Sequence, residues 1–410
     1  MRTLSYKDKK SIILTGNAYY PNIGGVENSL RHLAKSYLES GYHVDILVGN
    51  TNTVSEYVLP EYEVIEGISV YRFGAYGKWA QYPFINTCAR LYDMAKKFRK
   101  ISGCNTLAVI SRYHDTTLIA KLSIKLPVLY LIPGVVREQN KAINTFQSKS
   151  LQEKFVKRLK LHIHDTVQKL AFCHADVLLA FSNNMKQQVE TCLNGRQLDI
   201  KLTKPGVDSE RFQPIDKALK QPLRASLELP CKGTLLLGVG RLVRAKGFHY
   251  LIEALLYSES CSAIILGDGP EKETLQHLAE ELKVADRVIF KGGVNNPELY
   301  YQASDIFVMT SVYEPLGQIV LEALASGLPI VAFSKNAMPQ TSTEELLSHE
   351  ECVFVEHASA YHLGEGINRL VADKNQRESL SRRGRERAKS SYSWPSLAKE
   401  LRVVAEQIQL

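Results

Sequence analysis

Two carboxylates lie eight positions apart in the segment SVYEPLGQIVLEALASGLPIVAF, in contrasting surroundings. Glu314 stands beside a proline and a glycine, whereas Glu322 lies within an apolar run typical of a helix packed on a sheet. If this helix begins near Leu316, Glu322 lies about 9 Å farther along its axis, because each helical residue rises ~1.5 Å. A carboxylate accepts paired hydrogen bonds from neighbouring hydroxyls. The two side chains therefore predict a site for an elongated ligand with hydroxyls at both ends.

Two cations and several glycines lie in turns that should face these carboxylates. The turn GVGRLVRAKGF after one predicted strand carries Arg241 and Lys246, and GDGP and KGGVNN follow two further predicted strands. The carboxyl ends of parallel strands meet at one edge of a sheet, and helix N-termini there present N–H groups that suit phosphate. A single glycine turn is more often structural, but this succession predicts a diphosphate pocket.

Together these features predict a binding site for a nucleoside diphosphate sugar, which has hydroxyls at both ends and phosphates between them. The phosphates would accept hydrogen bonds from the N–H groups of Leu316 and Gly317 and would lie beside the two cations. The alternatives are structural, since Glu314 could stabilise a helix N-terminus and Glu322 could be a charge at a helix edge. The chain contains no DxD sequence, so we expect neither a metal ion nor another cofactor.

The elements that position these residues form two alternating series of strands and helices. At 410 residues the chain exceeds the size of most single cores, so two domains are expected. Apolar segments predict the strands of the first domain, at 11–15, 43–48, 107–111, 127–132 and 177–181. A helix is expected from Val26 to about Ser40, and a second alternating series begins at Thr234. This pattern predicts an α/β fold with two Rossmann-like, doubly wound parallel-sheet domains that face each other across a cleft.

The positive charge of the chain is concentrated in its first half. The formal net charge is +8; residues 1–205 hold 28 basic and 16 acidic side chains, and the remainder hold 23 and 27. The segment 149–170 can form an amphipathic helix with Phe155, Leu159 and Ile163 on one side, beside basic residues. Either this helix packs on its own domain with a solvated face, or it contacts an anionic membrane surface.

The sequence lacks the motifs that several other classes of protein require. GxGxxG does not follow the first strand and GxxxxGK[ST] is absent, which argues against a dehydrogenase and a P-loop NTPase. No basic stripe alternates with aromatic residues, so nucleic acid is not an expected partner. The seven cysteines form no CxxC pair, so reduced thiols and no zinc site are expected. With no secretory signal and no apolar run near ~20 residues, we expect a cytoplasmic protein, either free or peripheral at the inner face of the cytoplasmic membrane.

Motifs along almost the whole chain resemble those of the retaining glycosyltransferases of family 4, which have the GT-B architecture. They are YYPNIGGVE, KPGVDSERFQP, GVGRLVRAKG, LGDGPEKETL, ASDIFVMTS, EPLGQIVLEALASGLPIVA with its E-x7-E spacing, and YSWPSLAKEL. The resemblance implies transfer of a sugar, with retention, from a UDP- or GDP-sugar to a lipid-linked or saccharide acceptor of cell-surface polysaccharide synthesis. In such enzymes the leaving phosphate helps to take the proton of the acceptor. The implied domains are 1–205 for the acceptor, 206–232 as linker, 233–390 for the donor and 391–410 as a helix crossing back to the first domain.

The resemblance also assigns roles to individual residues. Glu322 would bind the ribose of the donor and Glu314 the hydroxyls of the transferred sugar, while Arg241 and Lys246 would hold the diphosphate. The region around Val294 would face the base. The glycines and backbone groups expected to line the donor are Gly24 and Gly25, which approach from the other domain, and Gly240, Gly269, Leu316 and Gly317.

One departure from the family pattern concerns a histidine. Many members carry a His in an H-G turn of the N-terminal domain, whereas the corresponding turn here is YLIPGVV, with Pro133 and Gly134. His114 follows an earlier strand and is the candidate catalytic replacement, and Arg112 could also point into the cleft. The alternative for His114 is a histidine in a loop or core. The missing His also leaves room for a protein that binds a nucleotide sugar without turning it over, and a sugar-nucleotide epimerase of GT-B fold is the remaining alternative.

Overall fold

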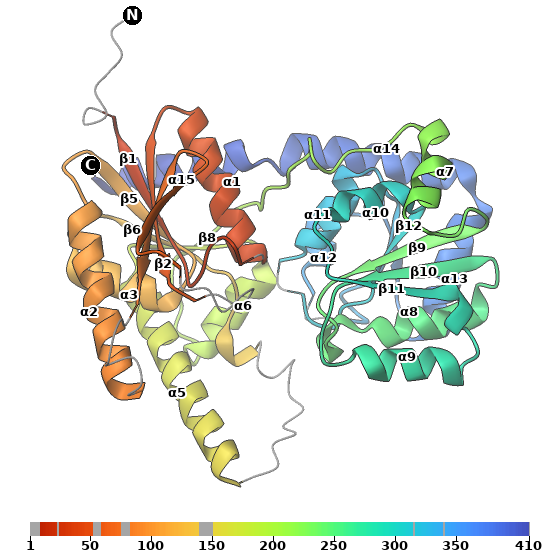
Figure 1. Ribbon diagram of the computed structural model, residues 1–410, viewed down its shortest axis with the longest axis horizontal. Helices are drawn as coiled ribbons and strands as arrows, with labels where there is room; N and C mark the ends of the chain where they lie inside the picture. Colours follow the sequence, from red (N-terminus) through yellow and green to blue (C-terminus); the bar gives the residue numbers. More distant parts are fainter. Residues whose placement is uncertain are drawn as a thin grey trace, which may run out of the picture.

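The computed structural model describes residues 9–22, 24–51, 59–74, 83–138, 151–314, 316–338 and 341–409; the side chains of 83, 84, 151–155 and 157 lie outside that description. Two separate β-sheets form the centres of the two halves of the molecule (Figure 1). Alternate residues of one strand belong to different cores: Ile12 and Leu14 lie in one cluster and Ile13 in another. Helices therefore cover both faces of the sheet, which confirms the predicted Rossmann-like architecture.

The first sheet has the order β3-β4-β2-β1-β5-β6-β7-β8, and its pairs are parallel except for β3 with β4. Its strands are β1 (Ser11–Thr15), β2 (His43–Gly49), β3 (Tyr62–Ile65), β4 (Ile68–Phe73), β5 (Thr106–Ser111), β6 (Val128–Leu131), β7 (Val177–Ala180) and β8 (Ile200–Leu202). Its helices are α1 (Gly25–Glu39), α2 (Pro83–Ile101), α3 (His114–Ser123), α5 (Leu151–His174) and α6 (Asn183–Cys192). The strand order reverses between β1 and β5, where doubly wound sheets bind ligands.

The second sheet is parallel throughout, with the order β11-β10-β9-β12-β13-β14. Its strands are β9 (Thr234–Val239), β10 (Cys261–Leu266), β11 (Val288–Gly292), β12 (Ile306–Met309), β13 (Ile330–Phe333) and β14 (Cys352–Val355). The helices of this half are α7 (Lys217–Ser226), α8 (Phe248–Ala254), α9 (Lys272–Glu281), α10 (Pro297–Ala303), α11 (Gln318–Ala325), α12 (Thr343–Leu346), α13 (Ala360–Ala372) and α14 (Lys374–Ser391), and the short 3-10 helices are η2 (Arg244–Lys246), η3 (Leu255–Tyr257) and η4 (Ala285–Arg287). The order reverses between β9 and β12, which places the turns after these two strands at the ligand-binding edge.

Two segments connect the halves, and they lie side by side. The chain crosses first between β8 and β9 and returns through α14 to α15 (Trp394–Gln409), which packs on the first half (Figure 1). The N–H of Val207 donates to the carbonyl of Tyr392 at 3.0 Å, so the outgoing and returning segments are hydrogen-bonded to each other. The hydroxyl of Tyr37 on α1 donates to the carbonyl of Ala398 at 2.9 Å, which fixes α15 on the first half.

The two halves also contact each other across the gap between the sheets. The carboxylate of Glu345 on α12 accepts the N–H groups of Asn183 and Asn184, the first two residues of α6, the latter at 2.8 Å. The hydroxyl of Tyr313 donates to the side-chain carbonyl of Gln188 on α6 at 3.2 Å. Leu316 packs against the core cluster of the first half. The loop that carries Glu314 is thus placed against the first half of the molecule.

Candidate active site

The turns after β9 and β10 approach each other backbone to backbone. Gly240 has φ +149° and Gly267 φ +129°. A Cβ on Gly267 would lie 2.0 Å from the carbonyl oxygen of Gly240, and one on Gly269 would lie 2.3 Å from that of Leu242. A residue with a side chain fits neither the dihedral angles nor the space. These contacts fix the turn that begins with Gly240 and carries Arg241 and Lys246.

Replacing Gly267 by Ala is expected to lower the free energy of unfolding by about 3 kcal/mol, through backbone strain and overpacking. The matched control is Gly41→Ala, at φ +86° with nothing within 4 Å of the new Cβ, where strain alone should cost about 1–2 kcal/mol. Thermal unfolding of the two variants measures the difference. Equal losses of unfolding free energy in the two variants would show that the close approach of the two turns contributes nothing to the cost of Gly267→Ala.

Lys246 and Glu314 form an ion pair at this edge. Lys246 Nζ pairs with Glu314 Oε2, and Glu314 Oε1 accepts the N–H of Gly317 at 3.2 Å. The side chains are 20% and 11% exposed respectively. The hydroxyl of Thr310 donates to the backbone carbonyl of Lys246 at 2.8 Å. The N–H of Ser342 donates to the backbone carbonyl of Glu314 at 2.9 Å. The structure thus joins the predicted cation and carboxylate, and the N–H of Gly317 that was predicted to bind phosphate is held by Glu314.

Arg241 is exposed beside this pair. Within the ranges that the structure describes, its guanidinium has neither a hydrogen-bond nor an ion-pair partner. The stem of Lys246 passes over Gly240, since a Cβ there would lie 3.2 Å from Lys246 Cε. Among the described residues, the turn therefore carries a paired cation, Lys246, and an unpaired one, Arg241, a composition suited to an anionic ligand.

Glu322 is the fifth residue of α11, which begins at Gln318 rather than near Leu316. Gly317, in the left-handed region at φ +73°, precedes the helix and delays its start by two residues. The hydroxyl of Tyr301 donates to Glu322 Oε2 at 2.9 Å. Burial raises the pKa of Glu322 to about 7, against the opposing effects of this hydrogen bond and of the Arg211 guanidinium. The carboxyl group is therefore poised to gain or lose a proton near neutral pH.

The loop after β11, which contains Val294, is tied to both of its neighbours at the same edge. Asp268 in the turn after β10 accepts the N–H of Gly293 at 2.6 Å. The guanidinium of Arg211 donates to the carbonyl of Asn295 at 2.9 Å, and its charge also acts on Glu322. Arg211 therefore brings the predicted base-binding loop and the predicted ribose-binding carboxylate into one region.

In the first half, Gly24 and Gly25 stand at the N-terminus of α1; a carboxylate of the same helix lies over Gly24, whereas nothing lies within 4 Å of a Cβ on Gly25. A Cβ on Gly24 would lie 2.5 Å from Glu27 Oε2. Burial raises the pKa of Glu27, with an opposing effect from Arg112. A negative group is favourable at a helix N-terminus, so Glu27 occupies the position that a ligand phosphate was predicted to approach. In the sequence, the only indication that Glu27 occupies this position is its place in the first turn of the predicted helix.

Arg112 lies deep at the carboxyl end of β5. Its guanidinium donates to the carbonyl of Leu131 at 3.2 Å and lies 5.2 Å from the centre of the Phe181 ring. It is 1% exposed, so in this arrangement it supports the edge of the first sheet and does not line an open cleft.

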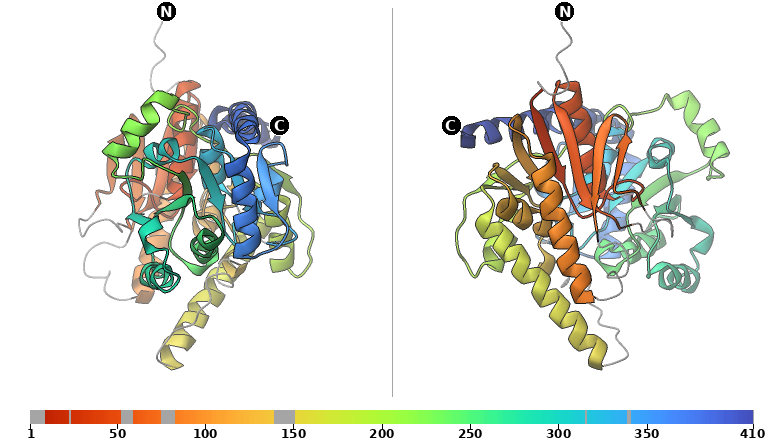
Figure 2. Two further views of the ribbon diagram at one scale, coloured as in Figure 1. Left: turned by 90° about the vertical axis from the view of Figure 1, so that its right-hand side faces the viewer. Right: turned by 60° about the vertical axis from the view of Figure 1, so that its left-hand side comes forward.

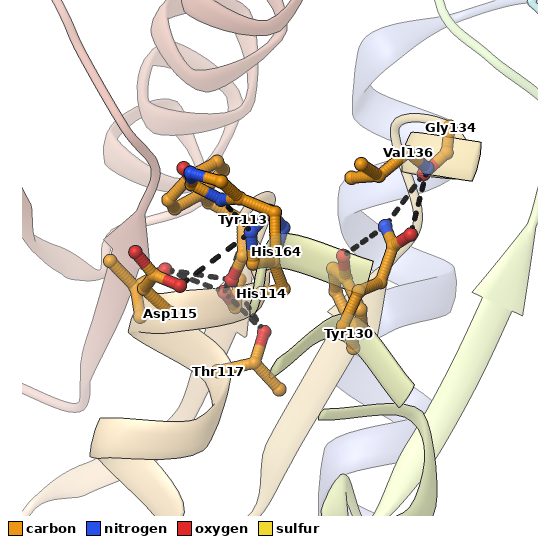
Figure 3. A network of polar contacts seen from close by, with 11 residues as sticks. Tyr113, His114, Asp115, Thr117, Tyr130, Gly134, Val136 and His164 are labelled. Carbon is orange, nitrogen blue, oxygen red and sulfur yellow. Dashed lines mark hydrogen bonds and ion pairs between the residues drawn. The ribbon is translucent and has the colours of Figure 1, made fainter. Parts of the chain in front are cut away.

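His114, the candidate catalytic histidine, lies in a buried cluster within the first half (Figure 3). Its Nε2 is 3.3 Å from Nδ1 of His164 on α5, and its ring packs on that of Tyr113. Burial lowers the pKa of His114 to about 4, and the neighbouring His164 lowers it further in the same direction. The imidazole is therefore neutral at neutral pH, and its polar partners in the described part of the chain, Asp115 included, all belong to the first half.

Tyr313 was not singled out by the sequence, yet it links the site to the first half. It is 7% exposed, and burial raises its pKa, as do the charges of Glu138 and Glu314. Glu138 belongs to the first half and Glu314 to the second, so the charges of carboxylates from both halves act on the tyrosine. A tyrosine directly before a loop carboxylate carries no periodic signal, which is why sequence patterns miss it.

Metal binding and membrane crossing each require particular groups of side chains. In the described ranges, no group of three or more His, Cys, Asp or Glu side chains could hold a metal ion. None of the helices in those ranges combines the length and the apolar character needed to cross a bilayer.

Comparisons with known proteins identify relatives for both halves. Residues 220–387 match the family described as glycosyl transferases group 1. An uncharacterised glycosyltransferase of Methanocaldococcus jannaschii is 27% identical over 397 residues, covering 93% of this chain and 94% of that protein. The lipopolysaccharide core biosynthesis glycosyltransferase LpsE of Rhizobium meliloti is 35% identical over 170 residues, covering 42% of this chain and 49% of that protein. The structure of HepE from Anabaena in complex with UDP-glucose is similar with a TM-score of 0.73 and 17% identity, covering 97% of this chain and 99% of the other.

Proposed function

Because the chain is a glycosyltransferase with the GT-B fold, similar to those of family 4, we propose that it transfers a sugar from a nucleoside diphosphate sugar to a hydroxyl of an acceptor. Retention of the anomeric configuration and independence of metal ions are part of this proposal. The observation that carries it is the Lys246–Glu314 pair, with the exposed Arg241 in the same turn, at the edge where the second sheet reverses its order. The UDP-glucose bound by the similar HepE supports a UDP-sugar as donor, and a GDP-sugar is the other donor to be tested.

The geometry suggests how this chain would act on such a donor. As the sugar departs, negative charge grows on the diphosphate, and the positive charges of Lys246 and Arg241 stabilise it. Lys246 can turn from Glu314 to the phosphate, which frees the carboxylate to accept hydroxyls of the transferred sugar. Glu322 accepts the ribose hydroxyls. The leaving phosphate takes the proton of the attacking hydroxyl, so the protein needs no side chain as base.

The decisive experiment is a panel of UDP- and GDP-sugars incubated with the protein, with and without EDTA. We expect slow hydrolysis of one donor, faster transfer when a saccharide or lipid-linked acceptor is added, an unchanged anomeric configuration by NMR, and no effect of EDTA. A protein that binds donors but hydrolyses none would be a nucleotide-sugar-binding partner. Appearance of an epimeric nucleotide sugar would identify an epimerase instead.

The proposed acceptor is a saccharide, free or lipid-linked, of cell-surface polysaccharide synthesis. The name of the Rhizobium relative supports this class, and so does the surface of α5, the helix predicted over 149–170. The N-terminal part of α5 extends away from the first half (Figures 1 and 2). Its side chains Val156, Leu159 and Ile163 are 48%, 49% and 52% exposed, so they are not packed on the domain; Phe155 lies outside the described side chains. Arg158 and Lys160 are exposed beside them.

We expect this apolar stripe, with its basic neighbours, to bind an anionic bilayer at the cytoplasmic face of the membrane. Replacing both Leu159 and Ile163 by Glu should reduce co-sedimentation with vesicles of phosphatidylglycerol and phosphatidylethanolamine by about 10-fold or more, since two apolar anchors and the charge balance are lost. The control is Leu219→Glu on α7 of the other half, where the leucine is 55% exposed. Equal binding of the double variant and the wild type, or equal binding to vesicles of phosphatidylcholine alone, would contradict an electrostatically assisted membrane contact.

A further inference from the structure

One buried amide on α5 holds the loop that follows β6. The side chain of Gln168 is 1% exposed. Its Nε2 donates to the carbonyl of Gly134 at 2.9 Å, and its Oε1 accepts the N–H of Val136 at 2.8 Å. Both ends of the amide are thus used on the backbone of one short segment, and the hydroxyl of Tyr130 lies 3.5 Å from Nε2.

This segment, residues 132–138, is irregular up to residue 135 and helical at 136–138. It leaves the carboxyl end of β6, at the same edge of the first sheet as the ends of β1 and β5. Its last residue, Glu138, is 9% exposed and lies close enough to Tyr313 for its charge to raise the pKa of that tyrosine. Tyr313 directly precedes Glu314. The segment held by Gln168 therefore ends near Tyr313, the neighbour of Glu314 in the chain.

Loss of the amide would remove two hydrogen bonds from this segment. Buried backbone groups need hydrogen-bond partners, and the carbonyl of Gly134 and the N–H of Val136 would each lose the bond to Gln168. Gly134 gives this segment a wide choice of backbone conformations. A misplacement of about 1 Å in a group that positions substrate can cost about 100-fold in rate.

We propose that Gln168 is a positioning residue for sugar transfer: its amide fixes the backbone at 134–136, so that this loop forms the wall of the donor-sugar site opposite Glu314. The inference rests on the proposed function and deepens it, because it assigns the recognition of the transferred sugar to a backbone wall in place of the histidine turn expected from the family. Gln168 itself does not touch the substrate.

The test compares Gln168→Leu, Gln168→Glu and the control Thr166→Val. The hydroxyl of Thr166 on the same helix donates only along its own helix, to the carbonyl of His162. We expect Gln168→Leu to lower kcat for transfer by about 10-fold or more, with the Kd of the free nucleotide diphosphate unchanged within about 2-fold, since the diphosphate is bound by the other half. Hydrogen exchange of peptides covering 132–138 should become faster in this variant and stay unchanged in the control.

The Gln168→Glu variant adds a pH readout that a merely structural role would not produce. An ionised carboxylate still accepts the N–H of Val136 but repels the carbonyl of Gly134, whereas a protonated carboxyl can donate to that carbonyl. The activity of this variant relative to the wild type should therefore rise as the pH falls. Wild-type kcat in Gln168→Leu, or an equal loss of kcat and nucleotide binding, would overturn the inference while leaving the proposed function intact. A wild-type protein that neither binds nor consumes nucleotide sugars would overturn both.

Discussion

Replacing Lys246 by Met should lower kcat/KM for sugar transfer by about 10²–10³-fold, the usual effect of removing one fixed group that stabilises charge in the transition state. Lys246 is the last residue of η2, and its ammonium is held by Glu314 while its stem passes over Gly240. A methionine keeps the length and apolar stem of the side chain but removes the charge. The measurement is steady-state kinetics with the donor identified by the nucleotide-sugar panel, together with thermal unfolding.

A second substitution, at Glu314, is needed to interpret the stability of Lys246→Met. Without Lys246, the carboxylate of Glu314, which is 11% exposed, keeps the N–H of Gly317 but loses its counter-charge. An uncompensated buried charge is destabilising, so Lys246→Met should unfold at a lower temperature, and the double variant with Glu314→Gln should regain much of this loss. Activity should stay low in the double variant. Arg244→Met, at an exposed position of the same turn, should leave activity within about 2-fold of wild type. Full activity in Lys246→Met would remove the basis of the proposed mechanism.

Replacing Glu322 by Gln should weaken donor binding by about 10- to 100-fold at pH 8, because hydrogen bonds from hydroxyls to a charged acceptor contribute about 1.5–3 kcal/mol. Burial raises the pKa of Glu322 to about 7, so the wild-type side chain is mostly a carboxylate only above that pH. Donor affinity of the wild type should therefore improve as the pH rises through about 7. In Glu322→Gln this dependence should disappear. Calorimetric titration with the donor from about pH 6 to about pH 8 measures both effects.

The same carboxyl group should affect stability in the opposite direction. Its native pKa, about 7, lies above its ordinary value of 4.5, so the native state keeps a proton that the unfolded chain has released. Its contribution to stability is complete below the ordinary value and is lost as the pH rises through about 7. Glu322→Gln should therefore gain thermal stability relative to the wild type at pH 8 but not at pH 4.5. Glu281→Gln, at an exposed position of α9, should show neither effect. A pH-independent wild-type affinity, or unchanged affinity in Glu322→Gln, would refute the ribose assignment.

The sequence predicted the fold where the apolar pattern is strong. The central strands of both sheets are short, continuous apolar runs buried on both faces, and Ile330–Phe333 of β13 is typical of them. The antiparallel hairpin of β3 and β4 was missed, because Tyr62 and Val64 are exposed and the turn depends on two residues with positive φ, Glu66 and Gly67. The segment expected to be a linker contains the helix α7, whose periodicity is interrupted by Pro222.

The sequence predicted which strands and turns carry the site residues, but it did not predict which side chains pair with each other. Lys246 and Glu314 were expected in one pocket, because β9 and β12 end at the same edge, but their direct pairing across 68 residues depends on side-chain packing. The roles of Gln168 and Tyr313 could not be predicted, since neither has a local pattern and both act through contacts made only in the folded chain. His114 follows the expected strand, but its burial beneath α5 and its pairing with His164 come from helix packing.

The two crossings between the halves restrict how the molecule can open. Val207 of the outgoing segment is hydrogen-bonded to Tyr392 of the returning segment. The two connections between the halves therefore lie side by side and form a single hinge region. The contacts of Glu345 with the start of α6 and of Tyr313 with Gln188 lie away from that hinge region along the chain. A rotation of the halves about the paired crossings would break the Glu345 and Tyr313 contacts, while the Tyr37–Ala398 hydrogen bond would keep α15 on the first half.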